Sequence, residues 1–187
     1  MKKTMLLALL LGAGSLARAA DTYTIDGAHT AANFAVKHLG ISTVHGRFSE
    51  VSGTILFENG APEKSSVTAV IKTASVNTDN SMRDNDLRSD NFFNAAKYPE
   101  IRFQSTSIRK AGADKYVAVG KLTIRDVTRD VEIPFTLAQG KSPKGQPRLG
   151  VDAALVLNRF DYNVSWDKTG TVVGKDVNIE LNLEAGK

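Results

Sequence analysis

Apolar and polar residues alternate along most of the chain after residue 20. A period of two is typical of β-strands with one buried and one exposed face. We predict strands at 23–25, 33–39, 45–57, 67–76, 101–108, 116–124, 131–137, 149–157 and 177–183. Turn residues such as Gly, Pro, Asn and Asp separate these runs. Seven to nine antiparallel strands predict a barrel or a sandwich, and the pattern alone does not choose between them.

Three features of the sequence predict where strands bend, lie at an edge or end. The offset between Phe48 and Val51 is odd, which predicts a bulge or bend between them. Pro134 falls on the outward face of its strand, which indicates an edge or a bulge because proline cannot donate to a sheet. The segment 140–147 is rich in Gly, Pro and Lys and is predicted to be a loop.

The alternation stops altogether between residues 77 and 103, in the stretch NTDNSMRDNDLRSDNFFNAAKYPEIRF. Arg83 and Arg88 lie in a run of alternating charges, and Phe92 and Phe93 follow side by side. Paired aromatic residues beside charges indicate the mouth of a cavity. Asp90 is also a helix-capping residue type, so we predict a short helix over 91–96.

Several motifs in this stretch and elsewhere are similar to one known family. They are RD, LRS, NFF and KYP within 83–99, DGAHTAANFAVKHLGISTVHGRF at 26–48, and GKLTIRDVTRDVEI at 120–133. The chain resembles the YceI-like family of periplasmic lipid-binding proteins. The resemblance implies an all-β fold, an antiparallel lipocalin-like barrel of about eight strands with one or two short helical segments. Asp86 stands where the family commonly has histidine.

The first nineteen residues have the pattern of a secretory signal peptide. Lys2 and Lys3 precede the apolar run 5–11, and Ala17 and Ala19 place small residues at the cleavage positions. The apolar run is shorter than the roughly 20 residues of a membrane anchor. We therefore expect a signal peptide at 1–19, a mature YceI-like lipid-binding domain at 20–187, and a periplasmic location without a transmembrane segment.

Composition narrows the function further. The formal net charge is +4, and removal of Lys2, Lys3 and Arg18 with the signal peptide leaves +1, so we expect no nucleic-acid partner. The chain has no cysteine, which excludes disulfides, thiol catalysis and thiolate metal ligands.

Sequence motifs of common enzymes are absent. The chain has no G-x-S-x-G elbow, no H-E-x-x-H pair and no phosphate-binding glycine loop. Its three histidines are irregularly spaced, and Asp26 with His29 would form only a weak metal site. We expect no enzymatic activity, no metal and no cofactor other than a bound lipid.

The candidate ligand contacts are mainly apolar. Inward-facing strand positions and the predicted mouth supply Phe34, Val36, Phe48, Ile55, Ile71, Leu87, Phe92 and Phe93. Each buried methylene of a ligand contributes ~0.8 kcal/mol, so an apolar cavity can hold a long chain without strong polar contacts. The family resemblance implies a polyisoprenoid or similar lipid, such as a prenyl diphosphate, a quinone tail or a fatty acid derivative.

Four polar residues have two interpretations each. His38 is either a hydrogen-bonded core residue or a contact to a ligand head group. Arg83 and Arg88, with Asp84, are either part of a solvated loop or a site that binds an anionic head group. In the second interpretation, Asp84 and Asp90 orient the two arginines.

The sequence leaves one alternative function open, a barrel with a filled core that acts as a stress-related or protein-interaction scaffold without catalysis. A homodimer and a membrane-protein partner are both compatible with the sequence. Storage and delivery of a lipid are equally compatible with it.

Overall fold

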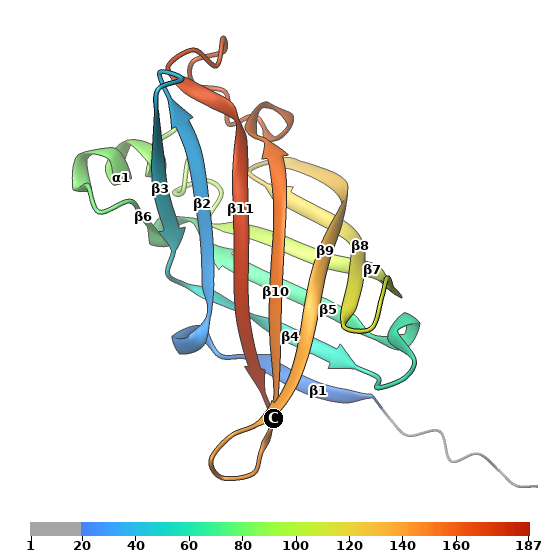
Figure 1. The fold of residues 1–187 in the computed structure, drawn as a ribbon. Helices are drawn as coiled ribbons and strands as arrows, with labels where there is room; N and C mark the ends of the chain where they lie inside the picture. Colours follow the sequence, from blue (N-terminus) through green and yellow to red (C-terminus); the bar gives the residue numbers. More distant parts are fainter. Residues whose placement is uncertain (1–19) are drawn as a thin grey trace, which may run out of the picture.

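The computed structural model describes residues 20–187, so the predicted signal peptide lies outside the described residues. The described chain contains one α-helix, α1 (Ser81–Arg88), and short 3₁₀ turns η1 (Gly27–His29), η2 (Pro62–Lys64), η3 (Thr73–Ser75) and η4 (Arg159–Tyr162). Its strands are β1 (Asp21–Ile25), β2 (Ala31–His38), β3 (Ser42–Phe48), β4 (Val51–Phe57), β5 (Ser66–Lys72), β6 (Val76–Asn77), β7 (Glu100–Lys110), β8 (Lys115–Ile124), β9 (Val127–Lys141), β10 (Pro147–Asn158) and β11 (Val173–Gly186) (Figure 1).

Eight strands close into an antiparallel ring. They follow the order β1-β4-β5-β7-β8-β9-β10-β11, and β1 pairs back with β11 through Thr24 with Gly186 and Ile25 with Ala185. Closure gives every strand of the ring a neighbour on both sides, although β9 and β10 pair only from Lys141 with Pro147 to Phe135 with Ala153. The predicted all-β barrel of about eight strands is confirmed.

The remaining strands extend the wall at one end. β11 pairs along one edge with β10, and along the other with β2 as far as Asn182 and then with β1. β3 and β6 continue outward from β2, and α1 lies beside β6 (Figure 1). β2, β3 and the α1 segment therefore wall the same end of the barrel. No helix within 20–187 is both long enough and apolar enough to cross a membrane.

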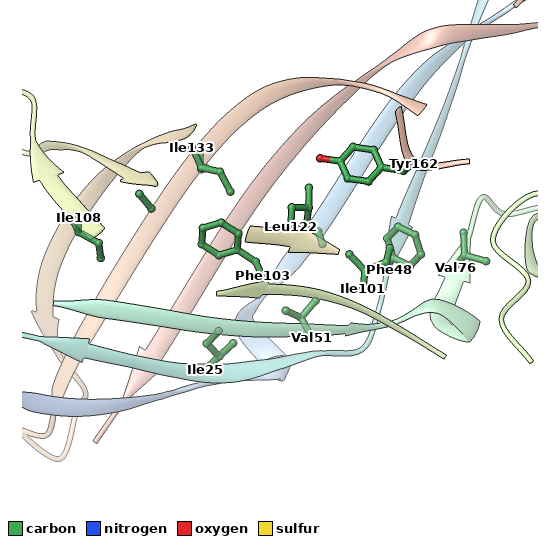
Figure 2. Close-up of a cluster of buried hydrophobic side chains, with 13 residues drawn as sticks. Ile25, Phe48, Val51, Val76, Ile101, Phe103, Ile108, Leu122, Ile133 and Tyr162 are labelled. Atoms are coloured by element: carbon green, nitrogen blue, oxygen red, sulfur yellow. The ribbon is translucent and has the colours of Figure 1, made fainter. Parts of the chain in front are cut away.

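The inward faces of neighbouring strands meet in the barrel interior. Ile71 lies opposite Ile101, Phe103 opposite Leu122, and Ala118 opposite Ile133, and most of these side chains are buried. Figure 2 shows the labelled members of this cluster converging from different strands. The inward-facing residues of the period-two pattern therefore line a closed space.

The predicted break between Phe48 and Val51 is confirmed. β3 ends at Phe48 and β4 begins at Val51, and both side chains are buried. Ser75 holds the two intervening residues, because its carbonyl accepts from the Ser49 hydroxyl at 3.3 Å and its hydroxyl accepts from the Glu50 amide at 3.1 Å. The chain can therefore change direction without burying an unpaired amide.

Pro134 is exposed on β9 at the point where pairing with β10 stops. The last pair in that ladder is Phe135 with Ala153. On its other side Pro134 lies opposite Val117 of β8, so it borders an unpaired stretch on one side only, which agrees with the predicted edge.

The predicted helix over 91–96 is wrong. The helix lies earlier in the chain, and Asn80 caps it by accepting a hydrogen bond from the Arg83 amide at 3.0 Å. Residues 91–96 form turns instead, with Asn94 in the left-handed region at φ 49°. A left-handed residue interrupts a right-handed helix.

Gly53 offers a test of the barrel wall. Its φ is 150°, and a Cβ atom there would collide with the Thr68 carbonyl oxygen on β5. We expect Gly53→Ala to lower the free energy of unfolding by about 1–3 kcal/mol. The matched control is Gly150→Ala, whose Cβ would meet the Ala138 Cβ at an ordinary 3.8 Å. Urea unfolding of both variants checks the contrast, and equal stabilities would contradict it.

Candidate functional site

The barrel interior contains an apolar cavity of about 170 Å³, which we call the main cavity. Side chains from β2 to β5 and from β7 to β11 line it, among them Val51, Ile55, Phe103, Leu122 and Ile133. Within its described lining, only Asn33, Ser65 and Tyr116 bring a polar side chain. Figure 2 shows several of the apolar side chains pointing toward one another across this space.

A second apolar space of about 120 Å³ adjoins the main cavity at the α1 end of the barrel, and we call it the end chamber. Phe34 and Phe48 line both spaces, with ring centroids 5.7 Å apart. Leu87 and Phe93 from the α1 segment close the chamber, and the Phe93 ring packs edge-on against Phe48 at 5.5 Å. The two spaces therefore share a boundary in which these two aromatic rings lie beside Ile101, Ile124, Leu157 and Ile179.

Glycine at position 46 makes room for this boundary. Gly46 pairs with Phe34 across β3 and β2, and a Cβ atom on Gly46 would collide with the Phe34 ring. The aromatic ring can thus lie over the neighbouring strand, which a larger residue would prevent.

Arg159 is the charged residue of the end chamber and is only 6% exposed. Each of its five N–H groups donates to a main-chain carbonyl: Nε to Gly174 at 2.9 Å, Nη1 to Val164 at 2.6 Å and Trp166 at 2.7 Å, and Nη2 to Asp167 at 3.2 Å and Val173 at 2.7 Å. Burial lowers the pKa of the guanidinium, which still stays charged. One side chain therefore joins η4, the segment after it and the start of β11.

Asp167 stabilises the loop that supplies two of these carbonyls. Its carboxylate accepts from the Thr169 hydroxyl at 2.6 Å, the Val173 amide at 3.0 Å and the Val172 amide at 2.6 Å. These hydrogen bonds, that from Thr169 first, lower the pKa of Asp167 to about 2. The carboxylate is therefore ionised except in strong acid, and the loop geometry around Arg159 is maintained.

The two arginines of the α1 segment contact main-chain carbonyls. Arg83 donates through Nη2 to the Thr78 carbonyl, and Arg88 donates to the Ala74 and Val76 carbonyls, at 2.7–2.8 Å. These bonds attach α1 to β6 and the turn before it. The structure thus assigns both arginines a structural contact.

Asp84 reaches Arg83 through an intermediate residue. It is buried and accepts from the Thr78 amide and hydroxyl at 2.8 and 2.6 Å, while the same hydroxyl accepts from Arg83 Nε at 2.8 Å. Asp90 is exposed and is not a partner of either arginine, so its proposed orienting role is wrong. Asp86 accepts from the Asn91 side chain at 2.9 Å and helps to end the helix.

A family model described as a YceI-like domain matches residues 23–185. The chain belongs to the YceI-like family. Protein YceI of Escherichia coli O157:H7 is 40% identical to it over 174 residues, which cover 89% of this chain and 90% of the relative.

Solved structures agree with this YceI-like fold. The crystal structure of Burkholderia cenocepacia BcnA matches with a TM-score of 0.79 at 27% identity, covering 86% of this chain and 98% of BcnA. A Saccharophagus degradans domain, described as a polyisoprenoid binding domain implicated in plant cell wall breakdown, matches with a TM-score of 0.69 at 17% identity. That match covers 90% of this chain and 99% of the domain, and at such low identity it is a likeness of fold.

The YceI-like barrel brings most of the sequence-predicted ligand contacts together. Ile55 and Ile71 line the main cavity, Phe34 and Phe48 line both spaces, and the end chamber is lined by Val36, Leu87, Phe92 and Phe93. His38 lies at the end of β2, half-buried, and outside both linings. Arg83, Asp84 and Arg88 also lie outside both linings.

Sequence reasoning missed Arg159 and Tyr162 of the end chamber. Both lie in η4, a single short turn after β10, where no hydrophobic period marks which side chains point inward. The only available signal was an arginine between the apolar strand and the aromatic Phe160 and Tyr162.

Asp26 and His29 come together with Glu184 on the barrel surface, and their ligand atoms lie within 4.8 Å of one another. His29 Nδ1 lies 3.0 Å from Asp26 Oδ2, and this hydrogen bond raises the pKa of His29. Arg148 also lies 3.8 Å from Asp26 and 3.6 Å from Glu184. Metal binding requires a neutral histidine, and the raised pKa of His29 favours its protonated form. Together with the nearby Arg148, this favours a cluster of ion pairs over a metal centre.

Loss of the Arg159 guanidinium should open this end of the barrel. We expect Arg159→Gln to lower the free energy of unfolding by at least about 3 kcal/mol, because buried carbonyls lose their donors. The control is Arg109→Gln, since Arg109 is 55% exposed and its side chain pairs with an exposed Glu132. That change should cost under about 1 kcal/mol. Chemical denaturation measures both, and a similar small loss in both variants would refute the structural role of Arg159.

Proposed function

We propose that this protein binds a long-chain lipid of the polyisoprenoid class inside its barrel, and that it does so in the periplasm without catalysing a reaction. The observation that carries the proposal is the lining of the main cavity, where all described side chains but three are apolar. The end chamber continues this apolar surface up to the α1 segment. Together they offer an elongated hydrocarbon environment to a chain-like ligand.

The physical case begins with the cost of an unfilled space. At ~24 cal/mol per Å³, a cavity of about 170 Å³ destabilises a barrel by about 4 kcal/mol if nothing fills it. A hydrocarbon chain restores the missing contacts and gains ~0.8 kcal/mol per methylene removed from water. Ligand binding and barrel stability are thus favoured by the same contacts.

Such a lining selects ligands by length and shape more than by polar recognition. Prenyl diphosphates, quinone tails and fatty acid derivatives share the long chain, and all three are candidates from the family resemblance. The Saccharophagus degradans domain described as polyisoprenoid binding has the same fold, which supports the ligand class.

The periplasmic location is supported by the signal-peptide pattern at 1–19. Storage and delivery between membranes are both uses of such a barrel. Contacts from His38, Arg83, Asp84 and Arg88 to a ligand head group stay a prediction.

Extraction of the purified protein tests the proposal directly. The mature protein, expressed with its signal peptide and recovered from the periplasm, is extracted with organic solvent, and the extract is analysed by mass spectrometry. We expect a long-chain lipid at close to one molecule per barrel and absent from a mock purification. Only background lipid, in a protein of full stability, would favour the filled-core scaffold.

Val36 supplies a variant that separates these outcomes. Val36 is half-buried in the end chamber, so we expect Val36→Trp to fill that space and to weaken binding of a fluorescent long-chain probe at least about tenfold, while the delipidated barrel stays folded. The matched control is Val156→Trp, because Val156 is 60% exposed on the outer face.

The control variant should bind the probe like the wild type. Probe titration and urea unfolding are measured on the same samples. A loss of about 1–3 kcal/mol in Val36→Trp, with no lipid in the wild type, would indicate a solid core and contradict the proposal.

A further inference from the structure

The turn between β2 and β3 exposes two large apolar side chains. Leu39 is 52% exposed and Ile41 is 84% exposed, the highest value among the exposed large apolar residues of the described chain. Apolar side chains at the end of a hairpin gain little from folding, because they have no core to pack against. Only a partner outside the barrel would remove them from water.

The backbone of this turn makes leucine an unusual residue for it. The Ile41 amide donates to the His38 carbonyl at 3.1 Å, and the two central residues both have positive φ, 52° for Leu39 and 71° for Gly40. Asn or Asp followed by Gly is the favoured sequence for such a turn, because a bulky side chain is strained at positive φ. Leu39 thus occupies a position that suits asparagine better, and a contact of its side chain would offset the strain.

The β2–β3 turn and the segment before β11 lie together at one end of the barrel (Figure 1). The Leu39 amide donates to the Val172 carbonyl at 2.8 Å. The Arg159 guanidinium joins the Val173 carbonyl to the carbonyl of Trp166, the single tryptophan of the chain. Trp166 is 40% exposed. We call the exposed apolar side chains of this end, Leu39, Ile41 and Trp166, the docking tip.

The docking tip adjoins the end chamber. The Trp166 ring packs on Phe92, with ring centroids 5.5 Å apart. Phe92 lines the end chamber, and so does Val173, the residue after the one that pairs with the Leu39 amide. Whatever covers the docking tip therefore lies next to the wall of the apolar interior.

Lysines surround the docking tip. The two segments that form it, 37–42 and 166–175, contain three exposed lysines, which are Lys37, Lys168 and Lys175. Their one acidic residue is Asp167, whose carboxylate accepts from the Thr169 hydroxyl and from two amides of its own loop. The exposed Asp176 follows Lys175 on β11. Three lysines thus face two carboxylates, one of which is engaged inside the loop.

We propose that the docking tip inserts into the surface of an anionic phospholipid bilayer. Leu39 and Ile41 enter the acyl region, Trp166 lies at the depth of the head groups, and the lysines contact phosphates. Tryptophan favours that depth because its ring is apolar and its N–H is polar, and lysines are attracted to an anionic surface.

A bilayer fits the shape of the docking tip better than a folded partner does. A stable protein interface covers about 800 Å² on each side, and a protruding turn offers much less. A fluid bilayer closes around such a turn without a matching surface. The inference rests on the proposed function for its purpose, since docking brings the end chamber against a membrane that supplies or receives the lipid.

Trp166 reports docking without a label. Delipidated protein is titrated with vesicles of phosphatidylcholine and phosphatidylglycerol in equal parts, and with vesicles of phosphatidylcholine alone. On the anionic vesicles, we expect the Trp166 emission to shift to shorter wavelength and to be quenched by lipids brominated on their acyl chains. Affinity for these vesicles should fall as salt is added, because salt screens the lysines.

Two variants remove the apolar contacts without disturbing the fold. We expect Ile41→Thr and Leu39→Asn each to weaken affinity for the anionic vesicles at least about fivefold. Asparagine suits the turn, so Leu39→Asn should unfold in urea no earlier than the wild type. The matched control is Val156→Thr, which should bind like the wild type because Val156 is exposed on the outer face of β10. Lys168→Gln should weaken binding roughly fivefold on the anionic vesicles only.

Unchanged Trp166 emission with anionic vesicles, or equal losses in Ile41→Thr and Val156→Thr, would overturn the docking tip. Sedimentation equilibrium detects a second copy as the partner: a dimer that dissociates in Ile41→Thr, without vesicle binding, also overturns it. Vesicle binding needs no lipid inside the barrel. A protein that docks but yields no lipid on extraction therefore keeps the docking tip and fails the proposed function, and a lipid-loaded protein that ignores vesicles does the reverse.

Discussion

Closure of the ring between β1 and β11 is the constraint on which the rest of the structure depends. Both edges of β11 are paired, one with β10 and the other first with β2 and then with β1. Backbone amides and carbonyls of the ring can therefore be satisfied within the wall, and the interior needs no polar side chains for that purpose. A lining that is almost entirely hydrocarbon is possible only under this condition.

The two ends of the interior are built differently. The wall is regular sheet, whereas the α1 end is closed by a helix, by turns and by the loop after η4. Irregular backbone has carbonyls without sheet partners, and Arg159 satisfies five of them with one side chain. Burial of a charge is costly unless all its donors are used, and here they are.

Stability and ligand binding are coupled in this arrangement. A core packed to ordinary density would be more stable on its own but would have no room for a ligand. The shared boundary of Phe34 and Phe48 also lies between two spaces of different character, one almost free of polar groups and one with a charged and a phenolic side chain.

The alternation of residues determined the strands and the inward positions, because the direction of a side chain in a strand depends only on its neighbours in sequence. The sequence pattern alone therefore identified four residues that line the cavities: Phe34, Val36, Ile55 and Ile71. Local sequence did not reveal the true helix cap at Asn80, because capping residue types also occur at Asp90, and backbone geometry decided between them. Tertiary structure alone assigned Arg159 its carbonyl partners and packed Tyr162 into the buried core. Those contacts join a turn to β11 and to the core, and no period in the sequence encodes which side chain of a turn will face a space that distant strands enclose.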